Sequence, residues 1–300
     1  MRKFETMRFV SVMAVAVAVA SCTNEAKYAE EPIDREVMPV RLAVADLEIQ
    51  PELTPNDTSV VYQRMALFTS TDYDTRYIYA VDADGVLSEE NGTSIAYFPA
   101  DHSPIDIIVV HPYTAVTDIN RPEAFCVQAD QSTETQYKAS DLMWGKAVNR
   151  EGSLDAQMLE MSHLMAKIVV CLTPGHDVRE LRGMSMNNIK RMCRVKMDTG
   201  TLEGTETIPG QTSVNALFSK AGKSSVATAL IPPQIISTAP FLYVRTNCGT
   251  AIYQFDKEQK MEAGYVYTLN ITVNRSAVYG IGRITDWSNV ENNKEKEGSL

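Results

Sequence analysis

Short runs in which hydrophobic and polar residues alternate recur along most of this chain, separated by glycine, proline, asparagine and aspartate. Such runs are typical of β-strands with one buried and one wet face. The clearest run is 264–274, in which the odd-numbered positions from Tyr265 to Val273 are apolar and the even-numbered positions from Thr268 to Asn274 are polar. An antiparallel sheet that is wet on one side requires this alternation.

The pattern predicts two groups of strands. The first group comprises 39–49, 59–69, 76–81, 93–98, 105–111, 123–128 and 137–143. The second comprises 158–172, 192–197, 225–231, 240–246, 250–256 and 264–274. A polar stretch with two glycines, 145–156, separates the groups, and 178–189 can be read either as a short helix or as a loop.

This layout predicts an all-β protein with two tandem antiparallel β-sandwich domains of the Greek-key, transthyretin-like kind. We expect an N-terminal domain at 37–150 and a C-terminal domain at 151–288, followed by a polar tail at 289–300. Chains of this size can each bury a core of their own.

The first residues predict export. Arg2, Lys3 and Arg8 precede an apolar run that is shorter than the roughly 20 residues of a membrane-spanning helix, and small residues then lead to Cys22. A charged start, a short apolar core and a small-residue cleavage site indicate a signal peptide over 1–21. The cysteine directly after Val-Ala-Ser resembles a bacterial lipobox, which implies acylation of Cys22; the alternative is a plain signal peptide. The polar segment 22–36 is then a flexible tether.

The net charge and the spacing of the cysteines argue against nucleic-acid binding and against a zinc site. Loss of 1–21 takes the formal charge from −10 to −12, and so acidic a chain is not expected to bind nucleic acid. The other cysteines are interpreted mainly as small buried hydrophobic residues, with a disulfide among them left open. They are Cys126, Cys171, Cys193 and Cys248. No CxxC or paired His/Cys spacing indicates a zinc site.

Enzyme signatures are missing from the sequence. There is no GxSxG, P-loop, HExxH or dinucleotide fingerprint, and Ser162-His163 is a neighbouring pair without a triad. Asp82-Ala83-Asp84-Gly85 lacks a glutamate at the EF-hand position and is better read as a hairpin turn. We therefore expect no catalysis, no cofactor and no metal.

Two motifs carry a resemblance. The segment 141–145 (DLMWG), followed by 159–172 (LEMSHLMAKIVVCL), resembles the signature of the fimbrillin-like lipoproteins of Bacteroidales, the subunits of type V pili. Shorter matching pieces occur in the same order at 96–99, 111–113, 230–234, 264–269 and 284–287. The resemblance therefore covers 37–287.

The residues of these motifs suggest structural roles. His163 precedes an alternating run and can bond a strand end, and Trp144 and Trp287 each follow a strand-like run and can cap a core. Asp141 and Lys167 complete the motif set.

The resemblance implies a mode of assembly. Subunits of type V pili reach the outer membrane as lipoproteins and are trimmed after an arginine by a trypsin-like protease, which removes the first strand and opens a groove for a strand of another subunit. In this chain 37–49 would be the removed strand and Arg64 the first arginine after it, whereas Arg41 lies within it and Arg35 before it. The partners would be other pilin subunits, in a fimbrium on the outer cell surface that serves adhesion.

The C-terminus departs from this scheme, because 289–300 is charged and lacks the alternating apolar residues of a donor strand. Either an internal strand such as 278–287 donates, or this subunit does not donate and is a tip or anchor subunit rather than a stalk subunit. The alternative function is a surface glycan-binding lipoprotein with tandem β-sandwiches, for which some of the thirteen tyrosines would stack on sugars.

Overall fold

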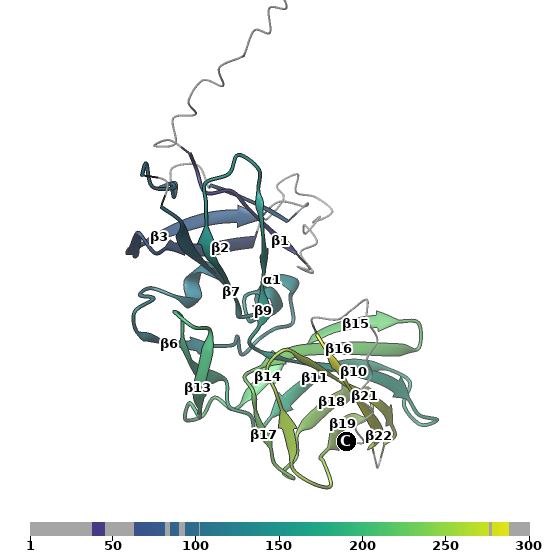
Figure 1. Ribbon diagram of the computed structural model, residues 1–300. Helices are drawn as coiled ribbons and strands as arrows, with labels where there is room; N and C mark the ends of the chain where they lie inside the picture. The colour runs from purple at the N-terminus through teal and green to yellow at the C-terminus, as the bar shows by residue number, and fades with distance from the viewer. Residues whose placement is uncertain are drawn as a thin grey trace, which may run out of the picture. The chain divides into compact units, whose positions relative to one another are not determined.

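The computed structural model describes residues 38–45, 63–81, 85–89, 94–101, 103–275 and 278–287. The leader 1–21, Cys22, the tether and the tail 289–300 lie outside these described residues. Figure 1 shows that the described chain is built almost entirely of strands, as the sequence predicts.

The elements up to residue 163 are β1 (Leu42–Ala45), β2 (Gln63–Thr69), β3 (Asp72–Val81), β4 (Val86–Glu89), β5 (Ile105–His111), the 3-10 helix η2 (Tyr113–Ala115), β6 (Pro122–Cys126), α1 (Glu134–Lys138), β7 (Met143–Arg150), β8 (Gln157–Glu160) and β9 (Ser162–His163). Those that follow are β10 (Ala166–Pro174), β11 (Leu181–Asn187), β12 (Met192–Lys196), β13 (Thr201–Glu206), β14 (Ser213–Asn215), β15 (Leu217–Ala221), β16 (Ser224–Ile231), β17 (Gln234–Ile236), β18 (Leu242–Thr246), β19 (Gly249–Tyr253), β20 (Gln259–Met261), β21 (Tyr265–Val273) and β22 (Val278–Asp286). No described helix is long and apolar enough to cross a membrane.

The N-terminal sheet has eight strands in the order β8-β1-β4-β3-β2-β5-β7-β9. β8 and β9 stand at opposite ends of this order, yet only Met161 separates them in sequence, so the sheet bends until its two ends meet. Gly145 on β7 marks the closure, because an added Cβ would lie 2.5 Å from the carbonyl oxygen of Glu160. The curved sheet encloses a core that we call the first core. It comprises Met38, Val40, Leu42, Val44, Met65, Leu67, Tyr79, Val81, Leu87, Ala96, Phe98, Ile105, Ile107, Val109, Ala147 and Leu159.

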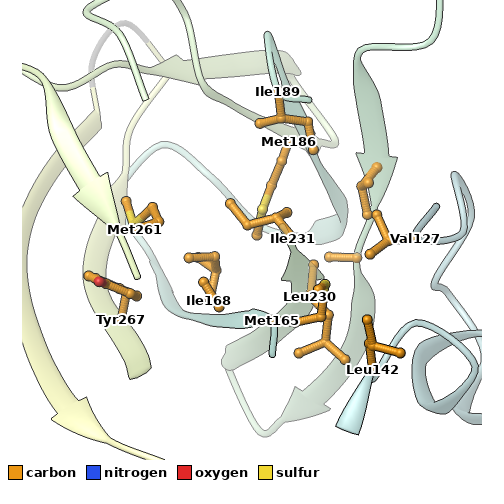
Figure 2. Close-up of a cluster of buried hydrophobic side chains, with 14 of the residues drawn as sticks. Val127, Leu142, Met165, Ile168, Met186, Ile189, Leu230, Ile231, Met261 and Tyr267 are labelled. Atoms are coloured by element: carbon orange, nitrogen blue, oxygen red, sulfur yellow. The ribbon is translucent and has the colours of Figure 1, made fainter. Parts of the chain in front are cut away.

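A second core lies between two further sheets, one with the order β15-β16-β10-β21-β22 and one with the order β14-β11-β18-β19. Figure 2 shows Ile168 and Tyr267 from the first of these sheets in one cluster with Met186 from the other. The alternation predicted for 264–274 is confirmed, because Tyr267, Leu269, Ile271 and Val273 are buried while Asn270 and Thr272 are exposed. β21 pairs antiparallel with β22 and parallel with β10.

β2 and β5 have one face in each core. Met65 and Leu67 on β2 belong to the first core, whereas Ala66 and Phe68, which alternate with them, belong to the second core. Ile107 and Val109 on β5 likewise alternate with Ile108 and Val110. Strands buried on both faces read as nearly continuous hydrophobic runs, which is how 65–68 and 107–110 appear in the sequence.

The predicted division between domains at residue 150 stays a prediction. Residues 35–300 form one compact unit by their contacts. β8, which lies beyond the expected boundary, pairs with β1 in the eight-stranded sheet, and β12 pairs with β6.

Several local expectations were wrong. The strand expected at 137–143 does not form: the helix α1, whose start the Thr133 hydroxyl caps at the backbone N–H of Gln136 in a Thr-x-x-Gln pattern, extends to Lys138, and β7 begins only at Met143. The junction expected at 145–156 begins inside β7, whose inward positions include Gly145 and Ala147, too small to stand out as hydrophobic.

The other differences concern breaks within and between strands. The segment 178–189, expected as a helix or a loop, contains β11. The run 158–172 is divided among β8, β9 and β10. Of the run 93–98, the described residues 94–98 form only a bridge, between Tyr97 and Pro39.

Candidate structural and assembly sites

The structure brings Asp141 and His163 together in a polar cluster. Asp141 follows α1, and its backbone N–H donates to the carbonyl of Lys138 at 3.0 Å. Its carboxylate Oδ1 accepts a hydrogen bond from Nδ1 of His163 on β9 at 2.8 Å. Both side chains are largely buried, with 9% of His163 and 16% of Asp141 exposed. A charged acceptor makes such a bond stronger than a neutral one.

Trp287 and Lys167 complete this cluster. The indole of Trp287 stacks on the imidazole of His163 with a centroid distance of 3.5 Å and an angle of 6° between the planes. Nζ of Lys167 lies 5.1 Å from the centroid of the Trp287 ring, within cation–π range. The cluster therefore joins the segment after α1, β9, β10 and the end of β22.

Gly264 forms main-chain hydrogen bonds to Met165 and to Trp287. Its N–H donates to the carbonyl of Met165 at 3.0 Å, and its own carbonyl accepts from the N–H of Trp287 at 2.9 Å. Its φ of +72° favours glycine over any residue with a Cβ. The ends of β10, β21 and β22 are thereby held to one another through main-chain bonds.

A second histidine also bonds Asp141. His111, at the end of β5, is buried, and its Nδ1 donates to the backbone carbonyl of Asp141 at 2.8 Å. Burial lowers the pKa of His111 below the ordinary value of 6.5, an effect opposed by the nearby carboxylate of Asp141. Asp141 thus links β5 through its backbone and β9 through its side chain.

Trp144 does not join the cluster. It lies on β7, and its Nε1 donates to the carbonyl of Met197 at 2.6 Å. Its ring packs over Gly200, where an added Cβ would lie 2.5 Å from Cδ2 of the indole, so any larger residue would displace Trp144. This tryptophan belongs to β7 of the N-terminal sheet and packs against the second core.

The chemistry available to the cluster is structural. His163 bonds a carboxylate on one side and stacks on an aromatic ring on the other, so these contacts hold the segments of the cluster together. Within the described part of the chain, no group of three or more His, Cys, Asp or Glu side chains is placed to hold a metal ion. Sequence reasoning missed His111 and Gly264 as members of this arrangement, although both lie in the matching pieces of sequence noted above.

β1 lies inside the eight-stranded sheet, within the segment 37–49 that the resemblance to type V pilins implies is removed. It pairs antiparallel with β4 on one side and parallel with β8 on the other. The alternate residues Met38, Val40, Leu42 and Val44 are buried in the first core, with exposed fractions of 5% or less. Removal of the strand would therefore separate β8 from β4 and uncover the first core.

The two candidate cleavage arginines differ in setting. Arg41 is exposed next to β1, and its Nη1 donates to the carbonyl of Leu154 at 3.4 Å. Arg64 is exposed near the start of β2, with its guanidinium 5.7 Å from the centroid of the Tyr113 ring. The bond after Arg64 leads directly to Met65, which is fully buried. Lipidation of Cys22 falls outside the described residues.

All four described cysteines are free thiols. Cys126 on β6 lies opposite Met192 on β12, whereas Cys193 lies opposite Phe125, so the two cysteines project from opposite faces of this pair of strands. Burial raises the pKa of Cys193 to about 12. This thiol is therefore a small core residue rather than a nucleophile.

Comparison with known proteins identifies the family. The family model described as fimbrillin-like matches residues 52–287, which is most of the chain. The chain belongs to the fimbrillin-like family. That family is one of fimbrial structural proteins, and membership supports a role as a subunit of a fimbrium at the cell surface. No curated protein sequence matches this fimbrillin-like chain.

Solved structures support the fold. A candidate cell adhesion protein of Bacteroides uniformis is 18% identical, with a TM-score of 0.61 over 83% of this chain and 98% of its own. A second, from Bacteroides ovatus, is 17% identical, with a TM-score of 0.61 over 83% of this chain and 97% of its own. Both therefore share the arrangement of strands along nearly their whole length.

Proposed function

We propose that this chain is a structural subunit of a type V fimbrium that assembles by protease-triggered β-strand exchange and serves adhesion. The observation that carries the proposal is the place of β1, an interior strand of the N-terminal sheet with strands paired on both sides. A vacated position of this kind offers main-chain hydrogen bonds and side-chain pockets to a strand from another chain.

The side chains of β1 give the groove its selectivity. Burial of one large aliphatic side chain contributes about 1.5–3 kcal/mol, so four alternate positions contribute about 6–12 kcal/mol. A donor strand must therefore carry apolar residues at every second position. It must also run parallel to β8 and antiparallel to β4 to restore both ladders.

Anchoring and activation complete the proposal. Cys22 is acylated and holds the exported chain at the outer membrane, while the trypsin-like maturation protease cuts after Arg64, with Arg41 as the alternative. The stretch 42–63 contains no lysine or arginine, so Arg64 is the first site at which such a protease can cut after β1 and remove it whole. The subunit needs no cofactor or metal and catalyses no reaction; its partners are other pilin subunits.

The C-terminus points to an end of the filament. β22 pairs with β21 over nine residues, and Trp287 directly after it stacks on His163. Release of β22 as a donor would break these contacts, and the tail 289–300 lacks donor alternation. We therefore propose that this subunit receives a strand and gives none, as a tip subunit; as an anchor it would instead keep its lipid and β1 and escape cleavage.

Trypsin treatment of the purified chain tests the assembly mechanism. The wild-type protein mixed with a donor subunit should lose the segment up to Arg64 and enter oligomers that survive mild detergent. Arg64→Gln should keep the segment and stay monomeric, whereas Arg121→Gln, a change at another exposed arginine, should behave as the wild type. Mass spectra of oligomers that retain residues 22–64 intact would overturn the proposed trimming.

A further inference from the structure

The outer face of the four-stranded sheet β14-β11-β18-β19 carries an ordered set of polar and aromatic side chains. Strand pairing places Ser185, Tyr243 and Ile252 in one row across β11, β18 and β19. The next row contains Gly183, Arg245 and Thr250. The opposite face of these strands packs into the second core, so both rows face away from it.

A bulge alters β11 beside this face. The register with β18 shifts between Leu181 and Gly183, which makes Arg182 the additional residue of the bulge. Bulges redirect side chains and are frequent next to functional sites. Arg182 and Arg245 both line a cavity of about 420 Å³, together with Thr246, Gly249 and Thr250.

Gly183 gives Arg245 its position in this cavity. A Cβ at residue 183 would lie 2.6 Å from Nη2 of Arg245 and 3.3 Å from its Nε, so the guanidinium occupies the space that a side chain would fill. Within the described part of the chain Arg245 has neither an ion pair nor a hydrogen bond from its side chain. Its planar set of donors is therefore available to a ligand.

The charges around the cavity favour an anion. Arg182 donates from Nε to Glu180 at 2.9 Å, and Lys220 lies 3.4 Å from the other oxygen of that carboxylate. Arg182 and Arg245 are thus the charged side chains that line the cavity, in a chain whose formal charge is −10. A local positive site on an acidic protein selects ligands that carry negative charge.

We propose that this sheet face binds an acidic glycan. Arg245 and Arg182 bind the carboxylate or sulfate group of a sugar, which suits the fork of guanidinium donors. The ring of the half-buried Tyr243, one position along the same face, stacks on the apolar face of the neighbouring sugar. Ser185 and Thr250 hydrogen-bond its hydroxyl groups. The aromatic ring of Tyr243, beside Ser185 and one position from Arg245 on the same face, favours a sugar over an acidic peptide.

This site is independent of strand exchange, because none of its residues belongs to β1, β4 or β8. Its occupation would give a surface fimbrial subunit a point of attachment to charged polysaccharide. Failure of trypsin-triggered assembly would leave the glycan proposal standing, and failure of glycan binding would leave assembly unaffected.

Affinity electrophoresis of the full chain tests the proposal, with gels that contain polygalacturonate, chondroitin sulfate, neutral dextran or poly-glutamate. We expect retardation by at least one of the two acidic polysaccharides, decreasing with added salt, and none by dextran. Arg245→Ala and Tyr243→Ser should each weaken binding by about tenfold or more. Gly183→Ala should also weaken it, because the added methyl group displaces Arg245.

Arg194→Ala is the matched control, since Arg194 is an exposed arginine on a strand of another sheet and its loss should leave retardation unchanged. Far-ultraviolet circular dichroism establishes that each variant is folded before binding is compared. Retardation by neither acidic polysaccharide overturns the proposal. Equal retardation of the wild type and Arg245→Ala, or retardation by poly-glutamate as strong as by the polysaccharides, overturns it as well.

Discussion

Single side chains in this protein act by joining segments that are distant in sequence. Asp141 bonds His111 through its backbone carbonyl and His163 through its carboxylate. A buried acceptor that loses its partner costs more than the bond itself contributes, because the remaining group is left without water or a donor. The effects of substitutions at these positions should therefore exceed those on the surface.

Asp141→Ala leaves Nδ1 of His163 without its acceptor in a largely buried site. We expect the free energy of unfolding to fall by about 1–3 kcal/mol. Urea unfolding followed by tryptophan fluorescence measures the change. Asp256→Ala, at an exposed position, is the control and should stay within about 0.5 kcal/mol of the wild type. Equal effects of the two substitutions would contradict a structural role for Asp141.

His111 predicts a pH dependence. Its folded-state pKa lies below the unfolded value of 6.5, so on acidification the unfolded chain takes up a proton that the folded chain resists. Its contribution to stability is fully present above about pH 6.5 and decreases as the pH falls toward the folded-state pKa. His111→Asn, which keeps a donor near the Asp141 carbonyl, should flatten the loss of stability between about pH 7 and pH 5. Parallel curves for the two proteins would show that another group is responsible.

At the scale of elements, two features stabilise the strands that matter for assembly. They are the burial of alternate residues along β1 and the contacts at the end of β22. Every second residue from Met38 to Val44, in β1 and the segment before it, is buried, while Arg41 between two of them is exposed. β22 is followed by the buried Trp287, whose indole stacks on His163 of β9. Release of β1 would therefore expose core residues, whereas release of β22 would also break the stacking of Trp287 on His163.

Leu42→Ala should lower the free energy of unfolding by about 2–5 kcal/mol, because it opens a cavity in the first core. Arg41→Ala, one residue earlier and pointing away from the core, should change it by less than about 1 kcal/mol. Chemical denaturation of both variants measures the difference. Equal effects would mean that the face of β1 that enters the core is assigned incorrectly.

Trp287→Ala should lower the free energy of unfolding by about 3–5 kcal/mol, because it removes a buried indole together with its stacking on His163. Trp287→Phe should recover part of the loss, since a smaller ring can still stack. Thermal unfolding followed by circular dichroism reports both. A loss no greater for alanine than for phenylalanine would indicate that the stacked contact contributes little.

For the whole molecule, the contribution of β2 and β5 to both hydrophobic cores predicts cooperative unfolding. Each strand has one face in the first core and one in the second, so neither core can lose these strands alone. We expect one transition, with coincident curves from tryptophan fluorescence and far-ultraviolet circular dichroism. Two separate transitions would instead support the independent domains that the sequence suggested.

The candidate site was only partly readable from sequence. Asp141, His163, Lys167 and Trp287 were singled out, but their meeting around one imidazole ring depends on how β9, β10 and β22 come together. Gly183 and Arg245 were not predicted as site residues. The guanidinium of Arg245 occupies the space that a side chain at position 183 would fill, and this contact depends on the pairing of β11 with β18, which the sequence does not reveal. The helix α1 had a local signal, the Thr133 to Gln136 capping pattern, that outweighed the apparent strand.

By itself the sequence determined that the protein is built of β-strands, which faces of the clearest strands are buried, and that it resembles the fimbrillin-like family. These properties follow from alternation and short motifs, which are local in the chain. The tertiary structure alone decided that β1 lies between β4 and β8, that β2 and β5 separate two cores, and that Arg182 joins Arg245 at one cavity. Strand order and register arise from pairing between distant segments, and the same local pattern is compatible with many such pairings.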